Sequence, residues 1–107
     1  MNEIKEYDEN NNVIYYRHIN GNEFWREYDK NNNLIHFKDS NNFESWREYD
    51  EKNREIYFKD FNGNESWYKF DENNKSISIT EQEFKQIEKQ ELYFNNKRIN
   101  RFELMDI

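Results

Sequence analysis

The sequence of 107 residues contains no cysteine, no proline, no alanine and only two glycines. Without cysteine the chain can form neither disulfides nor thiolate metal sites. Because alanine is absent and leucine is scarce, a long helical bundle is disfavoured. No apolar run approaches the length of a membrane span, and no apolar stretch follows Met1. We therefore expect no membrane association and no signal peptide, and a cytoplasmic location.

Aromatic and charged residues take the place of the missing types. Phe, Trp and Tyr make up 19% of the chain, charged residues make up 36%, and the net charge is −7. Low hydrophobicity suggests disorder, but disordered chains are poor in aromatic residues. The length favours one domain, residues 1–107. The acidic balance disfavours direct binding to nucleic acid, and it suits a protein that occupies a basic nucleic-acid channel on a partner.

An internal repeat covers residues 4–80, where several residue types recur every 21 positions. Four such units account for this part of the chain. The recurring residues are the pairs Tyr7-Asp8, Tyr28-Asp29, Tyr49-Asp50 and Phe70-Asp71, together with Trp25, Trp46 and Trp67, and with Ile14, Ile35, Ile56 and Ile77.

Each unit holds two short runs rich in Trp, Tyr, Phe and Ile, which are typical of strands. The predicted fold is mainly β, an antiparallel up-and-down meander of about eight strands. Asn20-Gly21, Asn41-Asn42 and Asn62-Gly63 favour two-residue type I′ turns. The segment 29–33 favours a three-residue loop in which Asn32 takes the left-handed conformation.

The odd period constrains the register, because a slip of one residue exchanges the two faces of a strand. Alternating two-residue and three-residue turns would keep the tryptophans on one face. This arrangement predicts an aromatic ladder in which each residue lies opposite the next across neighbouring strands. Glu27 and Glu48 would lie beside the ladder on the same face. The other face would carry Tyr15, Arg26, His36, Arg47, Tyr57 and Tyr68. The predicted ladder is Tyr16, Trp25, Phe37, Trp46, Phe58, Trp67 and Ile79.

The C-terminal segment departs from the repeat. Thr80-Glu81-Gln82-Glu83 is a capping box, which predicts an amphipathic helix over residues 81–91. Leu92-Tyr93-Phe94 and Arg98-Ile99 flank Asn95-Asn96, which predicts a short hairpin within residues 92–107. Helix and hairpin would together cap the end of the repeat array.

The aromatic ladder is the candidate partner-binding site, because Trp and Tyr dominate protein interfaces and an uncovered apolar patch normally has a partner. The alternative is that the ladder only stabilises the sheet through cross-strand pairs. The predicted partner-binding residues are Tyr16, Trp25, Glu27, Phe37, Trp46, Glu48, Phe58 and Trp67.

We expect no catalytic residues, no metal and no cofactor. Glu27 and Glu48 lie two strands apart in the predicted sheet, roughly 10 Å, which is marginal for a pair of catalytic carboxylates. His18 and His36 have no nucleophile at a matching position. The segment 8–12 resembles the start of a calcium loop, but it lacks the glycine and the bidentate glutamate of such loops, so Asx turns explain it better.

The Tyr-Asp-x-x-x-Asn-x-Ile pattern, as in Tyr7–Ile14 and Tyr28–Ile35, resembles the tyrosine–aspartate (YD) repeats of bacterial cell-wall and polymorphic-toxin shell proteins. The resemblance covers residues 4–80 and implies strips of β-hairpins without catalytic residues. The form beginning at Trp25 also resembles small repeat proteins of phages and mobile elements.

The leading hypothesis is a non-enzymatic acidic protein-binding module, of the kind that a phage or mobile element uses to inhibit a host enzyme. An anti-CRISPR or antirestriction protein would place its carboxylates in a basic nucleic-acid channel of that enzyme. The alternatives are a structural repeat protein that self-associates, for example as a homodimer through the aromatic face, an immunity or antitoxin partner, and a carbohydrate-binding sheet.

Overall fold

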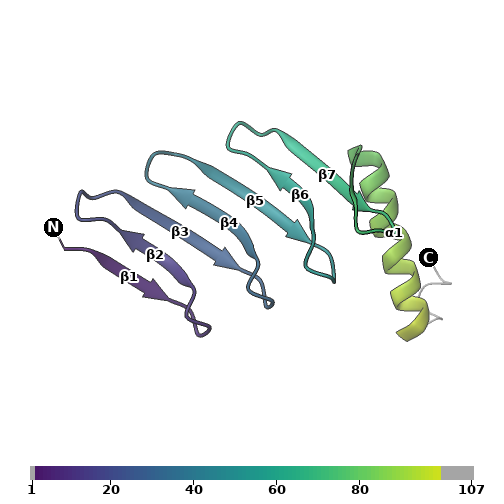
Figure 1. Ribbon diagram of the computed structural model, residues 1–107, viewed down its shortest axis with the longest axis horizontal. Coiled ribbons are helices and arrows are strands. Elements are labelled where there is room, and N and C mark those ends of the chain that lie inside the picture. The colour runs from purple at the N-terminus through teal and green to yellow at the C-terminus, as the bar shows by residue number, and fades with distance from the viewer. Residues whose placement is uncertain (1, 100–107) are drawn as a thin grey trace. The chain divides into compact units, whose positions relative to one another are not determined.

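The computed structural model describes residues 2–99 and shows an antiparallel sheet followed by a helix (Figure 1). The sheet has eight strands, and their order in the sheet is their order in the sequence. This confirms the predicted up-and-down meander. The strands are β1 (Ile4–Tyr7), β2 (Val13–Arg17), β3 (Glu23–Tyr28), β4 (Leu34–Asp39), β5 (Glu44–Tyr49), β6 (Glu55–Lys59), β7 (Glu65–Phe70) and β8 (Ser76–Ile79), and the helix is α1 (Glu81–Ile99).

The chain forms two compact units. The N-terminal unit, Met1–Ser66, contains β1 to β6, and the C-terminal unit, Trp67–Ile107, contains most of β7 together with β8 and α1. The repeated surfaces described below belong to the N-terminal unit.

All seven connections between the strands use one turn geometry. The first residue of each turn donates its N–H to the carbonyl oxygen four residues on, and its own carbonyl accepts the N–H three residues on. The loops therefore have three residues, and the third has positive φ, which Gly and Asn tolerate best. These third residues are Asn11, Gly21, Asn32, Asn42, Asn53, Gly63 and Asn74.

The left-handed conformation predicted for Asn32 is confirmed, with a φ of 64°. The two-residue type I′ turns predicted at 20–21, 41–42 and 62–63 are wrong. A type I′ turn needs positive φ at both central residues, and here only the second residue of each pair has it.

The odd period is absorbed by β-bulges instead of by two kinds of turn. The register shifts by one residue at Glu6/Tyr7 in β1, at Glu27/Tyr28 in β3 and at Glu48/Tyr49 in β5. A bulge places two residues opposite one and so changes the parity of the pairing. The pairs between β7 and β8 run from Trp67–Ile79 to Phe70–Ser76 without such a shift.

The bulges change which side chains share a face. Trp25 lies opposite Tyr15 and Lys38, and Trp46 lies opposite His36 and Lys59. The predicted ladder is therefore wrong in the N-terminal unit, where Tyr16, Phe37 and Phe58 lie on the face away from the tryptophans. The predicted pair of Trp67 and Ile79 is confirmed, because the fourth hairpin carries no bulge.

Little of the described chain is buried. The buried apolar side chains are Ile79 and Phe84, both in the C-terminal unit, and Ser45 is the buried polar residue. In the N-terminal unit the rings pack against one another across strands, for example Tyr16 on Phe24 at 5.0 Å and His36 on Trp46 at 5.4 Å between centroids. Cross-strand pairs thus stabilise the sheet within this unit, where the described residues add no second layer.

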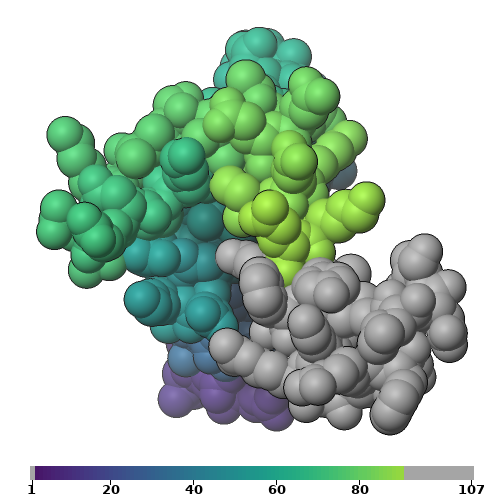
Figure 2. Space-filling model, turned by 90° about the vertical axis from the view of Figure 1, so that its right-hand side faces the viewer, coloured from purple at the N-terminus to yellow at the C-terminus, as the bar shows by residue number. Residues whose placement is uncertain are grey.

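The predicted capping box is present at the start of α1, where the N–H of Glu83 donates to Oγ1 of Thr80 at 3.1 Å. The first turns of α1 lie beside β7 and β8 (Figures 1 and 2). The helix continues to Ile99, so the hairpin predicted from residue 92 is wrong as far as residue 99, and its remainder lies outside the described residues. No Gly or Pro interrupts this segment, and Asn95 and Asn96 cost less than about 1 kcal/mol each inside a helix.

Candidate partner-binding surfaces

The register divides the side chains of the N-terminal unit between two faces. We call them the Trp face and the Phe face. The Trp face carries Glu6, Tyr15, Glu23, Trp25, Glu27, His36, Lys38, Glu44, Trp46, Glu48, Tyr57 and Lys59, and the Phe face carries Lys5, Tyr16, Phe24, Arg26, Phe37, Ser45, Arg47 and Phe58.

The Trp face contains an open hollow of about 540 Å³ over β3 to β6. Three of the predicted partner-binding residues, Glu27, Trp46 and Glu48, line it. The faces of the Trp46 ring are taken, because His36 stacks on it with an interplanar angle of 22° and Nζ of Lys59 lies 5.0 Å from its centroid. The hollow therefore offers carboxylates, the basic residues Arg47 and Lys59, and ring edges rather than a bare aromatic platform for a sugar.

His36 holds the strands around the hollow together. Its Nδ1 lies 3.1 Å from Oε1 of Glu27, and its Nε2 lies 2.6 Å from Oε2 of Glu44. Burial is the largest single effect on the pKa of His36 and lowers it, but the bonds and charges of the two glutamates together raise the pKa above its usual value. His36 thus joins β3 and β5 through β4, with a charge that depends on pH.

Sequence reasoning treated His36 as an ordinary sheet residue and missed this role. The signal was in the repeat, since Tyr15 and Tyr57 lie 21 residues to either side of it. The hydroxyl of Tyr15 donates to Glu23, and that of Tyr57 donates to Glu65 at 2.6 Å. His36 and Glu44 are the second copy of the same pair.

A row of exposed carboxylates runs along the Trp face at the repeat spacing. It consists of Glu6, Glu27 and Glu48, one from each of the first three units, and all three are exposed. The Glu27 side chain is 68% exposed although it contacts His36. One strand lies between neighbours in the row, so they are two strand spacings apart, or roughly 10 Å.

Aromatic rings on the Phe face form a continuous chain of contacts. Phe24 contacts Phe37 at 5.9 Å, Phe37 contacts Phe43 at 5.9 Å, and Phe43 contacts Phe61 at 5.1 Å. Phe43 and Phe61 belong to turns and are 40% and 54% exposed. The guanidinium of Arg26 lies over Phe24 at 4.4 Å.

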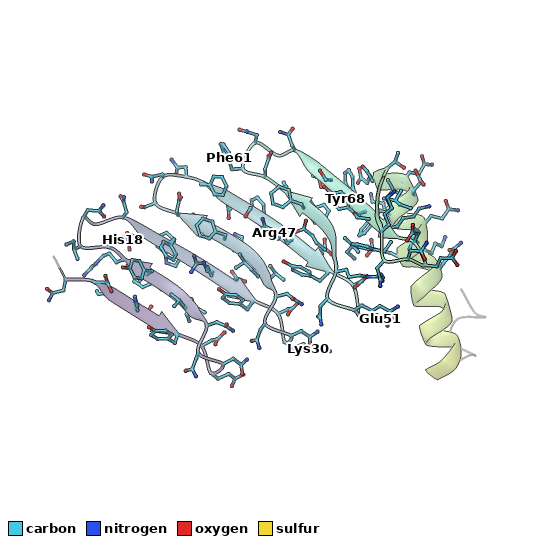
Figure 3. All side chains as sticks on the ribbon, viewed as in Figure 1. His18, Lys30, Arg47, Glu51, Phe61 and Tyr68 are labelled. Carbon is cyan, nitrogen blue, oxygen red and sulfur yellow. The ribbon has the colours of Figure 1, made fainter. Side chains whose placement is uncertain are left out.

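The two ends of the N-terminal unit differ in chemistry. His18 and Phe61 lie at one end of the strands, and Lys30 and Glu51 lie at the other (Figure 3). The first end carries the exposed Phe61 and Ile19, whereas the turns at the second end consist only of Asp, Glu, Asn, Lys and Arg.

The aspartate of each Tyr-Asp pair fastens its own turn. Oδ1 of Asp29 accepts the N–H groups of Asn31 and Asn33 at 2.8 and 3.0 Å, and Asp8 makes the same two bonds with Asn10 and Asn12. The predicted Asx turns are thus confirmed. The bond from the backbone of Asn12 is the main cause that lowers the pKa of Asp8.

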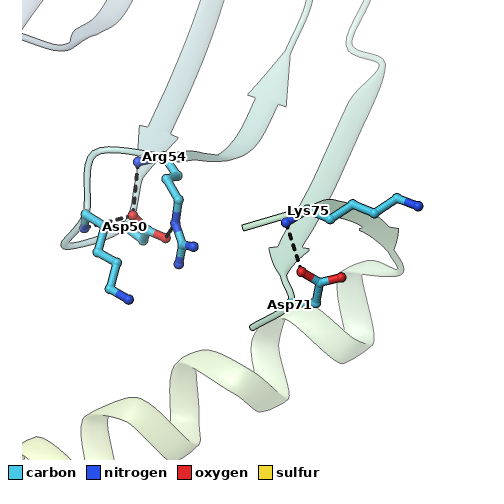
Figure 4. Close-up of polar contacts among 5 residues, drawn as sticks. Asp50, Arg54, Asp71 and Lys75 are labelled. Atoms are coloured by element: carbon cyan, nitrogen blue, oxygen red, sulfur yellow. Dashed lines mark hydrogen bonds and ion pairs between the residues drawn. The ribbon is translucent and has the colours of Figure 1, made fainter. Parts of the chain in front are cut away.

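Asp50 makes the strongest version of this turn in the N-terminal unit. Its Oδ1 accepts the N–H groups of Lys52 at 2.9 Å and Arg54 at 3.0 Å, and its Oδ2 lies 2.8 Å from Nε of Arg54 (Figure 4). Asp71 repeats the backbone contact with Lys75 in the C-terminal unit (Figure 4).

Asparagine side chains join neighbouring turns at the polar end. Nδ2 of Asn12 donates to Oδ1 of Asn32 at 2.9 Å, and Nδ2 of Asn33 donates to Oδ1 of Asn53 at 2.8 Å. These bonds connect successive units directly and fix the distance between their turns.

The structure therefore separates the predicted partner-binding residues. Trp25, Glu27, Trp46 and Glu48 share the Trp face, whereas Tyr16, Phe37 and Phe58 share the Phe face. Trp67 belongs to the C-terminal unit, opposite Ile79.

Among residues 2–90, whose side chains the structure describes, no group of three or more His, Asp or Glu is arranged to hold a metal ion. No helix in the described part of the chain combines the length and the apolar character needed to cross a bilayer. The sequence matches no protein-family model, and the search of curated proteins finds no similar protein.

Proposed function

We propose that this chain is a non-enzymatic, acidic protein-binding module that inhibits a host enzyme by covering its nucleic-acid-binding surface, as an anti-CRISPR or antirestriction protein of a phage or mobile element would. The observation that carries the proposal is the row of exposed carboxylates Glu6, Glu27 and Glu48 on the Trp face.

The row suits a basic surface because its charges stand at a fixed spacing on a rigid support. Cross-strand contacts and the bridge through His36 hold β3, β4 and β5 together, so the spacing of the strands that carry Glu27 and Glu48 is set before binding. A nucleic-acid channel presents Lys and Arg along a line, and complementary charge raises the rate of encounter with it. The net charge of −7 acts in the same direction.

The test compares two doubly substituted proteins with equal net charge. Glu27→Lys/Glu48→Lys reverses two members of the row, and Glu9→Lys/Glu51→Lys reverses two exposed carboxylates in the polar turns. Candidate enzymes are nucleases and CRISPR effectors from the host, and the readout is their binding to labelled duplex DNA. We expect wild type and the turn variant to inhibit DNA binding, and the row variant to lose at least about tenfold in potency.

Equal potency of the two variants would refute a role for the row. If wild-type protein inhibits no candidate enzyme at any salt concentration, the inhibitor function is wrong. Circular dichroism of both variants confirms that the sheet is intact before potency is compared.

A further inference from the structure

The two faces of the N-terminal unit carry rows of opposite charge at the same spacing. Lys5, Arg26 and Arg47 stand on the Phe face, and the residue after each of them is a glutamate of the carboxylate row on the Trp face. Because neighbours in a strand point to opposite faces, each cation stands directly behind a carboxylate. The three pairs recur every 21 residues, so both rows share one spacing.

The two arginines of the Phe face can each accept a further anionic partner, and Lys5 lies 3.6 Å from Glu3 of its own chain. Arg26 lies over Phe24 and Phe37, at 4.4 and 5.7 Å from their centroids. Arg47 contacts Glu55 through its Nε at 2.8 Å. Since a guanidinium has five donors, one such contact leaves the others available.

Within the N-terminal unit, the described residues form no second layer over the sheet. Protein domains bury apolar faces between at least two layers of secondary structure, but in the N-terminal unit the rings of the Phe face are only half-buried or exposed. A surface that completes this sheet has to be apolar or aromatic and to carry carboxylates at the spacing of Arg26 and Arg47. The Trp face of an identical chain has both properties.

We propose that a second copy of this chain packs its Phe face on the Trp face of the first, so that Lys5, Arg26 and Arg47 of one copy meet the carboxylate row of the other. Stacked sheets lie about 10 Å apart, within reach of Arg and Glu side chains. The match in spacing follows from the repeat itself. Copies related in this way use different surfaces, so the stack stays open and grows with concentration.

The opposite pairings are disfavoured by charge. Two Phe faces would bring the cation rows together, and two Trp faces would bring the carboxylate rows together, and like charges placed together in an interface repel each other. The association is therefore front to back, unlike a symmetric dimer through one aromatic face.

The experiment uses the full chain alone, in sedimentation velocity over a wide range of concentration. Variant A carries Arg26→Glu and Arg47→Glu, and variant B carries Glu27→Arg and Glu48→Arg. Each has like charges on both faces, so we expect self-association at least about tenfold weaker than that of wild type. An equimolar mixture of A and B restores front-to-back contacts between unlike copies, and we expect it to associate.

The net charge does not explain such a recovery, because each variant shifts the charge of −7 by four units and both stay negative. A monomeric wild type at all concentrations would overturn the proposal, as would an A and B mixture that stays monomeric while wild type associates. If either variant fails to fold by circular dichroism, Arg26→Gln/Arg47→Gln and Glu27→Gln/Glu48→Gln replace them. Undiminished association of both Gln variants would likewise overturn it. No partner enzyme is involved, so the outcome is independent of the proposed inhibition.

Discussion

Replacing Asp50 by alanine tests how strongly the aspartate of a Tyr-Asp pair stabilises the array. The change removes the acceptor of three bonds, from the N–H of Lys52 and from the N–H and Nε of Arg54. The N–H of Lys52 is exposed and regains a bond to water, whereas the N–H of Arg54 is partly buried. The variant also loses the partly screened ion pair between Asp50 and Arg54. Together these losses should lower the free energy of unfolding by about 1–2 kcal/mol.

The measurement is urea unfolding followed by tryptophan fluorescence at pH 7. For a domain of this size the slope is about 1–2 kcal/mol per molar urea, so the midpoint should fall by roughly 1 M. Glu51→Ala is the matched control, since it changes the exposed neighbouring carboxylate in the same turn. It should change the free energy of unfolding by no more than about 0.5 kcal/mol.

Asp50→Ala should no longer lower the free energy of unfolding at acid pH. Burial, the largest single effect, raises the pKa of Asp50, but the bonds from Arg54 and Lys52 together lower it below its usual value. A lowered pKa means that the stabilisation is present above the unfolded pKa, near 3.9, and is lost as the pH falls through the folded value. A difference between wild type and Asp50→Ala below about 0.5 kcal/mol at pH 7, or one that does not shrink below about pH 4, would refute this reasoning.

Two further predictions concern His36 and Phe84. His36→Tyr introduces the residue found at this position in the neighbouring units and keeps a hydrogen-bond donor for Glu44. Glu27 and Glu44 raise the pKa of His36. The stabilisation by His36 is therefore full below about pH 6.5 and is lost as the pH rises through the pKa of the folded state. Urea unfolding between pH 6 and 9 should therefore show a decline in wild type that is absent from His36→Tyr, and equal slopes would contradict the prediction. Phe84→Ala removes one of the few buried side chains, 7% exposed, and should destabilise the C-terminal unit by about 3–5 kcal/mol. Thermal unfolding monitored at 222 nm measures this loss, with the exposed Gln86→Ala as the control; similar melting of both variants would show that the burial of Phe84 contributes little.

The repeat made the strand order predictable, because each unit contains two aromatic runs separated by residues that favour turns. The repeat did not reveal which side chains share a face of the sheet. The sequence suggests two turn lengths as the source of the change of parity, because Asn20-Gly21 fits a two-residue turn and the segment 29–33 fits a three-residue loop. All the turns are alike, and the extra residue enters as a bulge in the partner strand, for example Ile35, which lies unpaired between Leu34 and His36 opposite the step from Glu27 to Tyr28. Isoleucine fits a regular strand equally well, so the composition of the strand does not reveal the bulge.

The candidate site was predictable in part for the same reason. Glu27, Trp46 and Glu48 were placed together correctly, since Trp46 and Glu48 alternate within one strand and Glu27 is the equivalent of Glu48 in the preceding repeat. Tyr16, Phe37 and Phe58 were misplaced, because their face depends on the register across a bulge. The extension of α1 was missed for a different reason. Asn95-Asn96 looks like a turn, but a helix tolerates Asn when no Gly or Pro ends it.

The bulge has a consequence for how such a protein can change in length. A bulge and two three-residue turns belong to each of the first three units of 21 residues. After one unit, each side chain points to the same face as its equivalent, the strand runs in the same direction, and the same kind of turn follows. Whole units can therefore be duplicated or deleted within β1 to β6 without inverting a single side chain, whereas the gain or loss of one residue in a strand would exchange its faces. Each duplication would lengthen the carboxylate row by one glutamate at the fixed spacing. The number of charges offered to a partner is thus set by gene duplication rather than by redesign of the surface.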